Sequence, residues 1–396
     1  MKICFISMEY PPETGWGGIG TYTYNQAHAL ANDGNEVHVI ALGVNSDIDY
    51  PDESVHVHRI KRIKTIKTKN PHFFGDCLIH SYNVFRKLKQ LSSKLDVVEV
   101  PEWRAEGFVS VFLGKTLSVT RLHTPSYLVN QFSGKENDLR THLVALNNAL
   151  VNSLERKQTM YSTGITSPTK ALQKEVAQAW NIDVSRITVI PNGIDINRIR
   201  SATIETLTES DYIVFVGRLE ARKGVHLLAK ALPGIFERFP NLKMVFVGSD
   251  MPYGKGTMKE LILSINSKYI HNIDFTGFVT EERKFSLIRN SKLVVLPSLW
   301  ENFPYTCLES MALGKAVIAS KNSGFEEVIE DNSSGFLVEP GNCKALQSKI
   351  ISCLEAEGQV SHVEKNARRK VENFNIVKVS KDSARYYERV LETSKQ

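Results

Sequence analysis

Residues 296–320, LPSLWENFPYTCLESMALGKAVIAS, place Glu301 and Glu309 eight positions apart behind a short apolar run. Pro304 lies between them and fits the first position of a helix, where its missing N–H would have no partner. We therefore expect Glu301 on the loop before a helix and Glu309 inside it. A helix N-terminus favours an anion, because its N–H groups are unpaired and the helix dipole is positive there. Two carboxylates around such a phosphate site suit a sugar joined to a nucleoside diphosphate.

The bulk composition indicates a soluble two-domain protein. A chain of 396 residues exceeds what one core usually serves. Five cysteines without paired spacing argue against a disulfide framework and for a reducing compartment. No run approaches the roughly 20 apolar residues of a membrane helix, and the N-terminus is too short an apolar run for a signal peptide. We expect a cytoplasmic protein.

Charge and ligand-type residues exclude two further classes. The formal net charge of +6 suits an anionic ligand or a membrane surface, but it does not indicate nucleic acid as a partner. No cluster of cysteine or histidine has the spacing of a metal site. We therefore expect neither a bound metal nor another cofactor.

Short β-branched runs alternate with longer helical patterns along the whole chain. Strands are expected at 2–7, 36–42, 55–60, 96–100, 118–122, 164–167 and 187–190, and then at 212–216, 243–247, 273–275, 293–296, 316–319 and 335–338. Several are continuous apolar runs, which is typical of parallel strands covered on both faces. The alternation predicts α/β architecture with doubly wound parallel sheets.

The pattern restarts at Asp211, so we expect two Rossmann-like domains facing across a cleft. The first covers residues 1–195, the second covers 211–372, and the polar stretch 196–210 is the linker. Residues 373–396 form a last helix that packs back on the first domain, with apolar positions at Val377, Val379, Ala384, Tyr387 and Val390. Ligands of such sheets bind at the carboxyl ends of the strands, and the interdomain cleft is the expected site.

Residues 217–224, GRLEARKG, begin where the first strand of the second half ends. Arg218 and Lys223 would therefore point into the cleft and neutralise a pyrophosphate, the arginine through paired hydrogen bonds. The alternative is a solvated basic loop, which is our interpretation of Arg222.

The glycine cluster at residues 15–20, GWGGIG, matches G-x-G-x-x-G literally. Such a match would suggest an enzyme that binds a nicotinamide dinucleotide, and two observations argue against it. The cluster does not follow its strand directly, and the next strand ends in Gly43 rather than in an acidic residue that could hold a ribose. We expect Gly17 and Gly18 on a loop that opens a helix and meets a phosphate or the acceptor. The alternative is a structural turn. Residues 248–256, GSDMPYGKG, fail the spacing of an NTPase phosphate loop.

Two further features have open interpretations. His123 ends an apolar strand in TRLHTP and either binds a sugar hydroxyl or is a structural histidine. A basic run is either a solvated loop or a contact for anionic lipid headgroups, which the pair Phe73 and Phe74 mildly supports. Its members are Arg59, Lys61, Arg62, Lys64, Lys67 and Lys69.

The chain resembles the retaining, nucleotide-sugar-dependent glycosyltransferases of family four, which have the GT-B architecture, because its motifs occur in that family's order. The resemblance covers nearly the whole chain. It rests on the glycine loop, RLHTP, SPTKAL, IPNGID, GRL…KG, TGFV and the Glu-x7-Glu pair.

The resemblance implies roles for individual residues. Arg218 and Lys223 would contact the donor pyrophosphate, Glu309 the ribose hydroxyls, and Glu301 and His123 the donor sugar. The backbone of Phe278 and Val279 would meet the base. One position departs from the family: the usual Glu-Gly-Phe-Gly reads Glu-Asn-Phe-Pro at residues 301–304. Pro304 lacks an N–H, so Tyr305 and Thr306 would have to supply the phosphate donors.

The expected function is therefore transfer of a sugar from a nucleoside diphosphate to an acceptor hydroxyl with retained anomeric configuration. Polysaccharide or lipid-linked glycan assembly is the use that the resemblance favours. The alternatives are a nucleotide-sugar epimerase or phosphorylase on the same scaffold, and a non-catalytic protein that binds nucleotide sugars.

Overall fold

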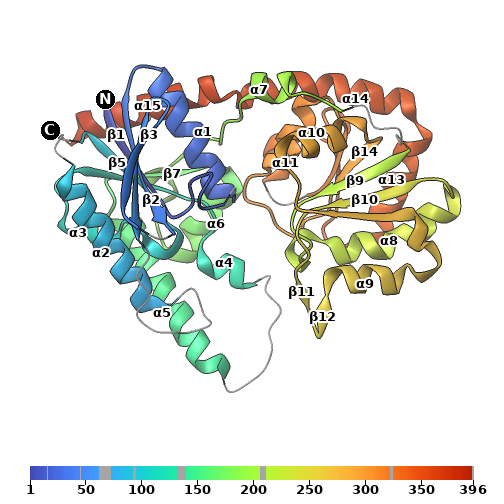
Figure 1. The fold of residues 1–396 in the computed structure, drawn as a ribbon, viewed down its shortest axis with the longest axis horizontal. Coiled ribbons are helices and arrows are strands. Elements are labelled where there is room, and N and C mark those ends of the chain that lie inside the picture. Colours follow the sequence, from blue (N-terminus) through green and yellow to red (C-terminus); the bar gives the residue numbers. More distant parts are fainter. Residues whose placement is uncertain are drawn as a thin grey trace. The chain divides into compact units, whose positions relative to one another are not determined.

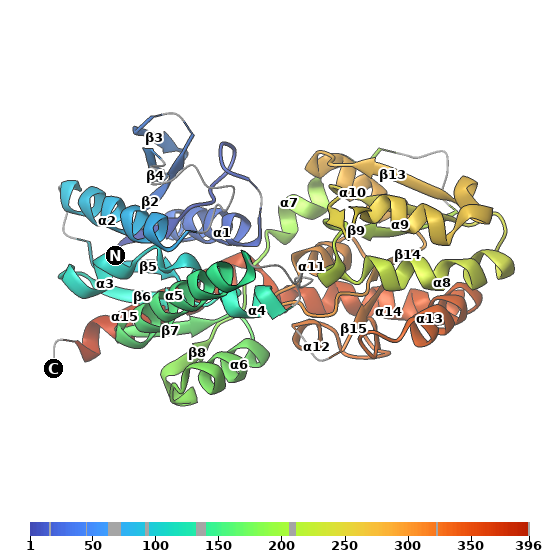
Figure 2. The same cartoon turned by 90° about the horizontal axis from the view of Figure 1, so that it is seen from below.

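The computed structural model describes residues 1–15, 17–44, 46–61, 73–91, 95–131, 140–205, 211–321 and 324–394. The chain forms two compact units, each an α/β fold (Figures 1 and 2). Unit 1 contains the first half of the chain, which ends at Gly193, together with the returning segment Ile376–Gln396. In the part of the chain that the structure describes, unit 2 is the segment Ile194–Asn375. Among the described residues, no helix is long and apolar enough to cross a membrane.

Unit 1 is built on an eight-stranded sheet with the order β3-β4-β2-β1-β5-β6-β7-β8. The strands are β1 (Lys2–Ser7), β2 (Glu36–Gly43), β3 (Ile48–Asp52), β4 (Val55–Lys61), β5 (Val97–Pro101), β6 (Leu117–Arg121), β7 (Gly164–Ser167) and β8 (Ile187–Val189). All pairs are parallel except β3 with β4.

Helices cover both faces of this sheet. They are α1 (Gly18–Asn32), α2 (Phe74–Gln90), α3 (Phe108–Leu113), α4 (Ser126–Gln131), α5 (Arg140–Tyr161), α6 (Lys170–Trp180) and α15 (Ile376–Thr393). Alternate residues of β1 show the two faces: Ile3 and Phe5 pack with α1 and α15, while Cys4 and Ile6 pack with α2. The continuous apolar pattern of the strand follows from this double coverage.

Unit 2 has a six-stranded parallel sheet with the order β13-β10-β9-β14-β15-β16. The strands are β9 (Tyr212–Val216), β10 (Lys243–Val247), β13 (Ile273–Gly277), β14 (Leu293–Leu296), β15 (Val317–Ser320) and β16 (Phe336–Val338), and a separate hairpin pairs β11 (Pro252–Tyr253) with β12 (Gly256–Thr257). The helices are α7 (Ile196–Ser201), α8 (Val225–Arg238), α9 (Met258–Ile265), α10 (Glu281–Asn290), α11 (Tyr305–Ala312), α12 (Phe325–Val328), α13 (Cys343–Glu355) and α14 (Glu357–Lys370). One core joins the sheet to α7, α10, α11 and α14, and the other joins it to α8, α9 and α13.

Every strand expected from the sequence is present, with ends that differ by at most two residues. The antiparallel strand β3 was not expected. It holds Pro51 and lies at the sheet edge, where a proline is tolerated because one side of the strand needs no donor. Its polar, proline-containing sequence IDYPD therefore looks like a loop.

Two details of the expected domain organisation are wrong. Residues 196–201 are not linker but form α7, whose Ile196 and Ile199 are buried in the core of unit 2. In the last helix, Val377 is exposed, whereas Tyr386 is buried against unit 1. The helix presents Val379, Tyr386, Tyr387 and Val390 to the core.

Candidate functional site

The carboxyl edge of the unit 2 sheet is lined by glycines. Gly217 and Gly248 directly follow β9 and β10, and Gly277 is the last residue of β13; their φ angles are 150°, 139° and 68°. A Cβ on Gly248 would lie 2.1 Å from the Gly217 carbonyl oxygen, so the neighbouring strand ends approach too closely for side chains. Glycine is required here, and the bare backbone leaves this edge open to close approach by a ligand.

The loop after β9 is pinned against the loop after β14. Gly224 has a φ of 68°, and a Cβ there would lie 1.8 Å from the Pro297 carbonyl oxygen. This contact holds Lys223 beside Glu301: the Lys223 Nζ donates to Glu301 Oε2 at 2.5 Å. The Ser298 hydroxyl donates to the same oxygen at 3.4 Å. The sequence placed these residues 78 positions apart in one site, and the structure brings them into contact.

The sequence-based interpretation of Arg222 as a solvated side chain is wrong. Its guanidinium is largely buried, donates to Glu220 Oε1 at 2.8 Å and lies 3.8 Å from Glu301 Oε1. Arg218 is the solvated one, with 59% of its side chain exposed and a longer 3.4 Å contact to Glu220. Three cations thus meet two carboxylates, which leaves this loop with a net positive charge.

The carboxylate of Glu301 is held ionised by its neighbours. Burial raises its pKa, but the charges of Lys223 and Arg222 lower it by more, so the carboxyl titrates below its ordinary range. Glu301 therefore acts as an anchor that orients two cations at this edge.

The helix expected after Pro304 is α11, although Pro304 is the N-cap residue rather than the first helical residue. Glu301 precedes the helix and Glu309 lies within it. Glu309 Oε1 accepts a hydrogen bond from Lys284 Nζ on α10 at 2.8 Å. Its Oε2 is buried and accepts none from the residues that the structure describes. A buried carboxylate oxygen without a donor is costly, so this atom is suited to a ligand hydroxyl.

The other residues expected at the donor differ in their availability. Phe278, directly after β13, has 79% of its surface exposed, whereas Val279 packs against the core. The Tyr305 N–H, expected as a phosphate donor, donates to the Phe303 carbonyl at 3.2 Å. The role of Thr306 as a donor stays a prediction. The N-cap residues of α8 and α11, Gly224 and Pro304, provide no side-chain cap to their helices.

In unit 1, the glycine loop is occupied by a carboxylate of the chain itself. Gly17 is the N-cap residue of α1, which begins at Gly18. The Gly20 N–H donates to Glu9 Oε2 at 3.3 Å, and a Cβ on Gly17 would lie 2.1 Å from the same oxygen. Glycine is therefore needed so that Glu9 can reach the end of α1. An anion already sits where the sequence suggested a phosphate.

His123 lies at the carboxyl end of β6, and its ring is buried. The backbone N–H of His123 donates to Glu102 Oε2 at 2.7 Å, and the imidazole ring lies 5.2 Å from the ring of Tyr22 in an edge-on arrangement. Burial, with the nearby charge of Arg121, lowers the pKa of His123 to about 3. The imidazole is thus neutral at ordinary pH, and it can exchange hydrogen bonds with a hydroxyl but cannot supply a positive charge.

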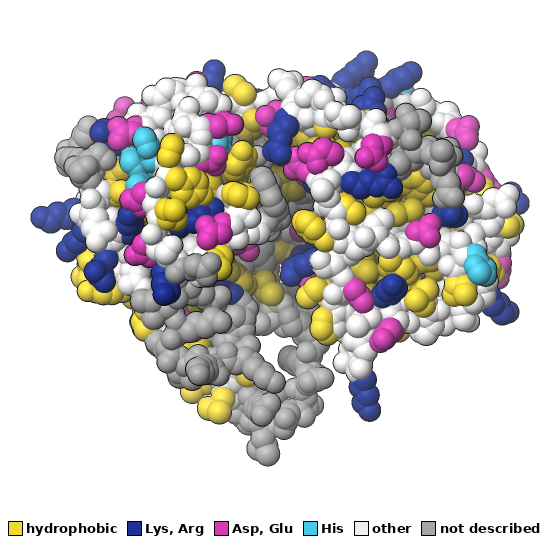
Figure 3. All heavy atoms as spheres, in the orientation of Figure 1, with side chains coloured by type: hydrophobic (Ala, Val, Ile, Leu, Met, Phe, Trp, Pro, Cys, Tyr) yellow, Lys and Arg dark blue, Asp and Glu magenta, His cyan; other side chains and the backbone are white. Residues whose placement is uncertain are grey.

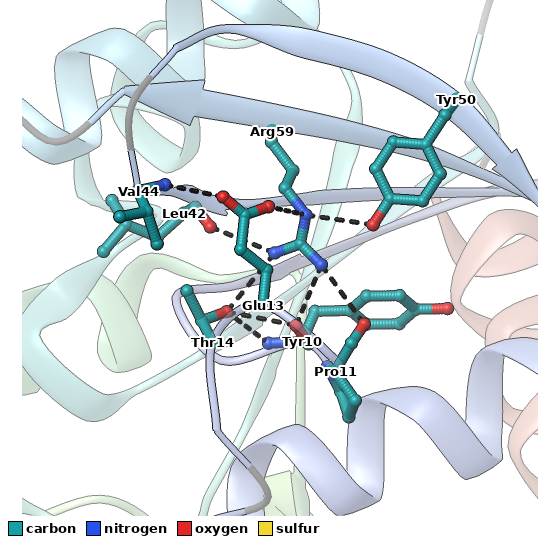
Figure 4. A network of polar contacts seen from close by, with 8 residues as sticks. All are labelled: Tyr10, Pro11, Glu13, Thr14, Leu42, Val44, Tyr50 and Arg59. Atoms are coloured by element: carbon teal, nitrogen blue, oxygen red, sulfur yellow. Dashed lines mark hydrogen bonds and ion pairs between the residues drawn. The ribbon is translucent and has the colours of Figure 1, made fainter.

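The prediction that the basic run is a surface loop is wrong for Arg59, which is completely buried (Figure 4). Its Nε lies 2.7 Å from Glu13 Oε2. The guanidinium also donates to five other acceptors, namely the Tyr50 and Thr14 hydroxyls and the carbonyls of Leu42, Tyr10 and Pro11, the last two through one nitrogen. Arg59 therefore fixes the loop after β1. Arg62, Lys64, Lys67 and Lys69 lie outside the described residues.

Figure 3 shows acidic and basic side chains interspersed over the described part of one face, with lysine and arginine gathered near α14. The last turn of α14 carries Arg368, Arg369 and Lys370. Among the described residues, no group of three or more His, Cys, Asp or Glu side chains is arranged to hold a metal ion.

Two family descriptions match almost the whole chain. Residues 16–198 match Glycosyltransferase Family 4, and residues 199–370 match Glycosyl transferases group 1. The chain belongs to glycosyltransferase family 4. An uncharacterized glycosyltransferase of Methanocaldococcus jannaschii is 27% identical over 410 residues, which cover 99% of each chain.

Solved structures show that this glycosyltransferase has the GT-B fold. Sucrose-phosphate synthase from Thermosynechococcus elongatus matches with a TM-score of 0.81 and 18% identity over 99% of each chain. Anabaena HepE in complex with UDP-glucose matches with a TM-score of 0.69 and 18% identity, covering 98% of this chain and 99% of that one.

Sequence reasoning missed Lys284, Arg222 and Glu9. Lys284 and Glu309 lie on different helices, and Glu9 reaches Gly17 across a loop, so no local spacing joins either pair. A signal for Arg222 was present: it adjoins Lys223 in the same loop, and Glu301 needs more than one cation when it is buried.

Proposed function

We propose that this glycosyltransferase moves a sugar from a nucleoside-diphosphate sugar to an acceptor hydroxyl and retains the anomeric configuration. The observation that carries the proposal is the cationic loop after β9, where Lys223 and Arg222 are anchored by the buried Glu301 at an edge lined by glycine. The likeness to HepE, which was solved with UDP-glucose, supports this choice of donor class.

The cationic loop after β9 would act on the diphosphate leaving group. In the transfer, the bond between the anomeric carbon and the diphosphate oxygen breaks, and a bond to the acceptor oxygen forms on the same face. The departing diphosphate gathers negative charge, which Arg218, Arg222 and Lys223 would stabilise. Preorganised charges of this kind usually supply the largest catalytic term. The acceptor proton passes to the departing phosphate oxygen, so no separate base is needed.

A double-displacement mechanism with two carboxylates fits this edge less well. Such a mechanism needs one carboxylate as nucleophile and one as acid and base. Glu301 is bonded to Lys223, and Glu309 is bonded to Lys284. We assign Glu309 Oε2 to the ribose hydroxyls instead, because it is a buried acceptor, and the exposed Phe278 to the face of the base.

The family is the support for our choice of acceptor class. We propose a glycan or a lipid-linked saccharide, with unit 1 as the acceptor side. His123 would contact hydroxyls as a neutral imidazole.

A thermal-shift screen with UDP, GDP, ADP and their sugars tests the donor, because a ligand that binds only the folded state raises the melting temperature. The nucleotide sugar that gives a shift is then incubated with the protein, and the product is examined by NMR. Retained configuration at the anomeric carbon supports the proposal. An altered sugar without transfer would indicate an epimerase, and a shift without turnover would indicate a binding protein.

A further inference from the structure

A strained segment follows β5 at the carboxyl edge of unit 1. Arg104 and Ala105 have φ angles of 55° and 51°, in the left-handed region that residues with a Cβ rarely adopt. Two such residues in succession persist only where the surroundings hold them, and such strain gathers at functional sites. The structure shows what holds them.

One carboxylate on α5 ties this segment to the neighbouring loop. Glu155 is completely buried, and its Oε1 accepts the Arg104 N–H at 2.8 Å. The same oxygen accepts the Ser126 hydroxyl at 2.5 Å, and Oε2 accepts the Ser126 N–H at 3.0 Å. A single side chain thus joins the loop after β5 to the loop after β6, which carries His123.

The next turn of α5 braces only the first of these loops. Gln158 Oε1 accepts the Gly107 N–H at 2.9 Å, and its Nε2 donates to the Pro101 carbonyl at 2.8 Å. A second link to His123 comes from Glu102, whose Oε2 accepts the His123 N–H. Glu155 and Gln158 are therefore a matched pair: both hold the loop after β5, but only Glu155 reaches the loop after β6.

We infer that Glu155 is a positioning residue for the unit 1 part of the site, acting on His123 through Ser126 and the strained Arg104 segment. This inference rests on the proposed function, in which His123 contacts sugar hydroxyls from unit 1. The carboxyl ends of β5 and β6 lie side by side, where ligands of such sheets bind. Burial raises the pKa of Glu155 to about 7, against hydrogen bonds that lower it, so its environment also departs from that of an ordinary carboxylate.

The test compares Glu155→Gln with Gln158→Ala. UDP release from UDP-glucose is measured without and with added acceptor, and UDP affinity is measured by calorimetry. We expect Glu155→Gln to lower kcat by about tenfold or more, because small misplacements of a site are costly, with UDP affinity unchanged. Gln158→Ala should lower the melting temperature but leave kcat within about twofold, since it does not touch the His123 loop.

Ser126→Ala provides the coupling measurement and a variant that leaves the α5 core intact. Ser126→Ala should also lower kcat. Adding it to Glu155→Gln should bring no further loss of kcat, because both changes break the same link between Glu155 and Ser126. Hydrogen exchange supplies a readout that needs no donor. Glu155→Gln should accelerate exchange at residues 123–126 and 104–107, whereas Gln158→Ala should accelerate it only at 104–107.

The inference is overturned if kcat in Glu155→Gln stays within about twofold of the parent, or if kcat in both variants simply follows the melting temperature. Unchanged exchange at residues 123–126 would overturn it as well, whatever the donor proves to be. If the parent protein bound none of UDP, GDP and ADP, that result would instead refute the proposed function; if it binds GDP or ADP in place of UDP, the same measurements are made with that nucleotide and its sugar.

Discussion

The carboxyl edges of the two sheets share an architecture but differ in charge. In unit 2, the edge presents cations, of which Arg218 is solvated and Lys223 is anchored by Glu301. In unit 1, the edge buries Glu102 and Glu155 and holds His123 as a neutral imidazole. An anionic leaving group suits the first edge, and an uncharged hydroxyl suits the second. Under the proposed function, the same doubly wound scaffold would support two binding chemistries, because the loops rather than the sheets set the charge.

The units also differ in how the chain builds them. Among the described residues, unit 2 comes from a single stretch of the chain, whereas unit 1 is completed by α15. Tyr387 on this helix donates to Glu99 Oε2 on β5 at 2.5 Å, and Tyr386 bonds with both backbone groups of Ile165. The C-terminal helix is therefore part of the core of unit 1.

The largest effect is expected from a chain that ends at Asn375. Without α15, unit 1 loses Val379, Tyr386, Tyr387 and Val390 from its core, and we expect its cooperative melting transition to disappear. Unit 2 should still melt cooperatively and bind UDP. Calorimetry with and without UDP measures both transitions. An unchanged melting curve would show that α15 is dispensable.

Lys223→Ala tests the cationic edge. The variant removes charge from the leaving group and leaves Glu301 facing Arg222 alone. We expect a loss of about 3–4 kcal/mol of transition-state stabilisation, in the range of one lost oxyanion donor, and about 2–4 kcal/mol for Arg218→Ala. The measurement is kcat/KM for the donor found in the screen.

The control for these variants is Lys292→Ala, at the amino end of β14, which removes a surface lysine paired with Asp211. It should leave kcat/KM unchanged. Near-normal turnover in Lys223→Ala would contradict the assignment of the loop to the leaving group.

The sequence predicted the fold well because its main signals are local. Apolar runs such as KMVFV and LVVL mark strands that are buried on both faces, and each is a strand of unit 2. The polar edge strand β3 was missed because an edge strand needs no continuous apolar pattern. The helix α7 was missed because its short sequence INRIRS shows little periodicity.

The candidate site was only partly predictable. Lys223 and Glu301 could be placed together, since both follow strands that end at one edge. Arg59 could not be placed, because its burial depends on Glu13 and on carbonyls from another loop. Likewise, Glu155 gives no local signal, since its partners lie 29 and 51 positions away. Charge alone does not tell a solvated side chain from a buried one.

Glu309→Gln should have a smaller effect than the substitutions of Lys223 and Arg218. If Glu309 Oε2 accepts a ribose hydroxyl, the variant should weaken UDP binding by about 1.5–3 kcal/mol, the usual range for a hydrogen bond to a charged group. The sharper measurement compares UDP with 2′-deoxy and 3′-deoxy UDP by calorimetry. The parent should prefer UDP over at least one of them, and the variant should lose that preference. An equal preference in both proteins would remove Glu309 from the ribose.

The smallest expected effect is on the pH dependence of stability. It comes from two buried histidines of unit 1 that pair between the neighbouring strands β2 and β4. His38 Nδ1 lies 3.0 Å from His58 Nε2. Burial lowers the pKa of both, against the contacts of His38 with Glu36 and of His58 with Asp49, which raise it. The neighbouring charges of His56 and Lys2 lower the pKa of His38 further, and that of Lys87 lowers the pKa of His58.

Because these histidines have folded pKa values below the unfolded value of 6.5, protonation favours the unfolded state. Their contribution to stability is complete above pH 6.5 and is lost as the pH falls from there toward the folded values. The loss amounts to at most about 1.4 kcal/mol per pH unit for each proton taken up. Melting of unit 1 followed at several pH values above and below 6.5 should show this slope, and the double variant His38→Gln/His58→Gln should flatten it. His271→Gln, an exposed histidine in unit 2, is the control and should change nothing. An equal slope in the double variant would place the pH dependence elsewhere, and would leave the contrast between the two units to their carboxyl edges alone.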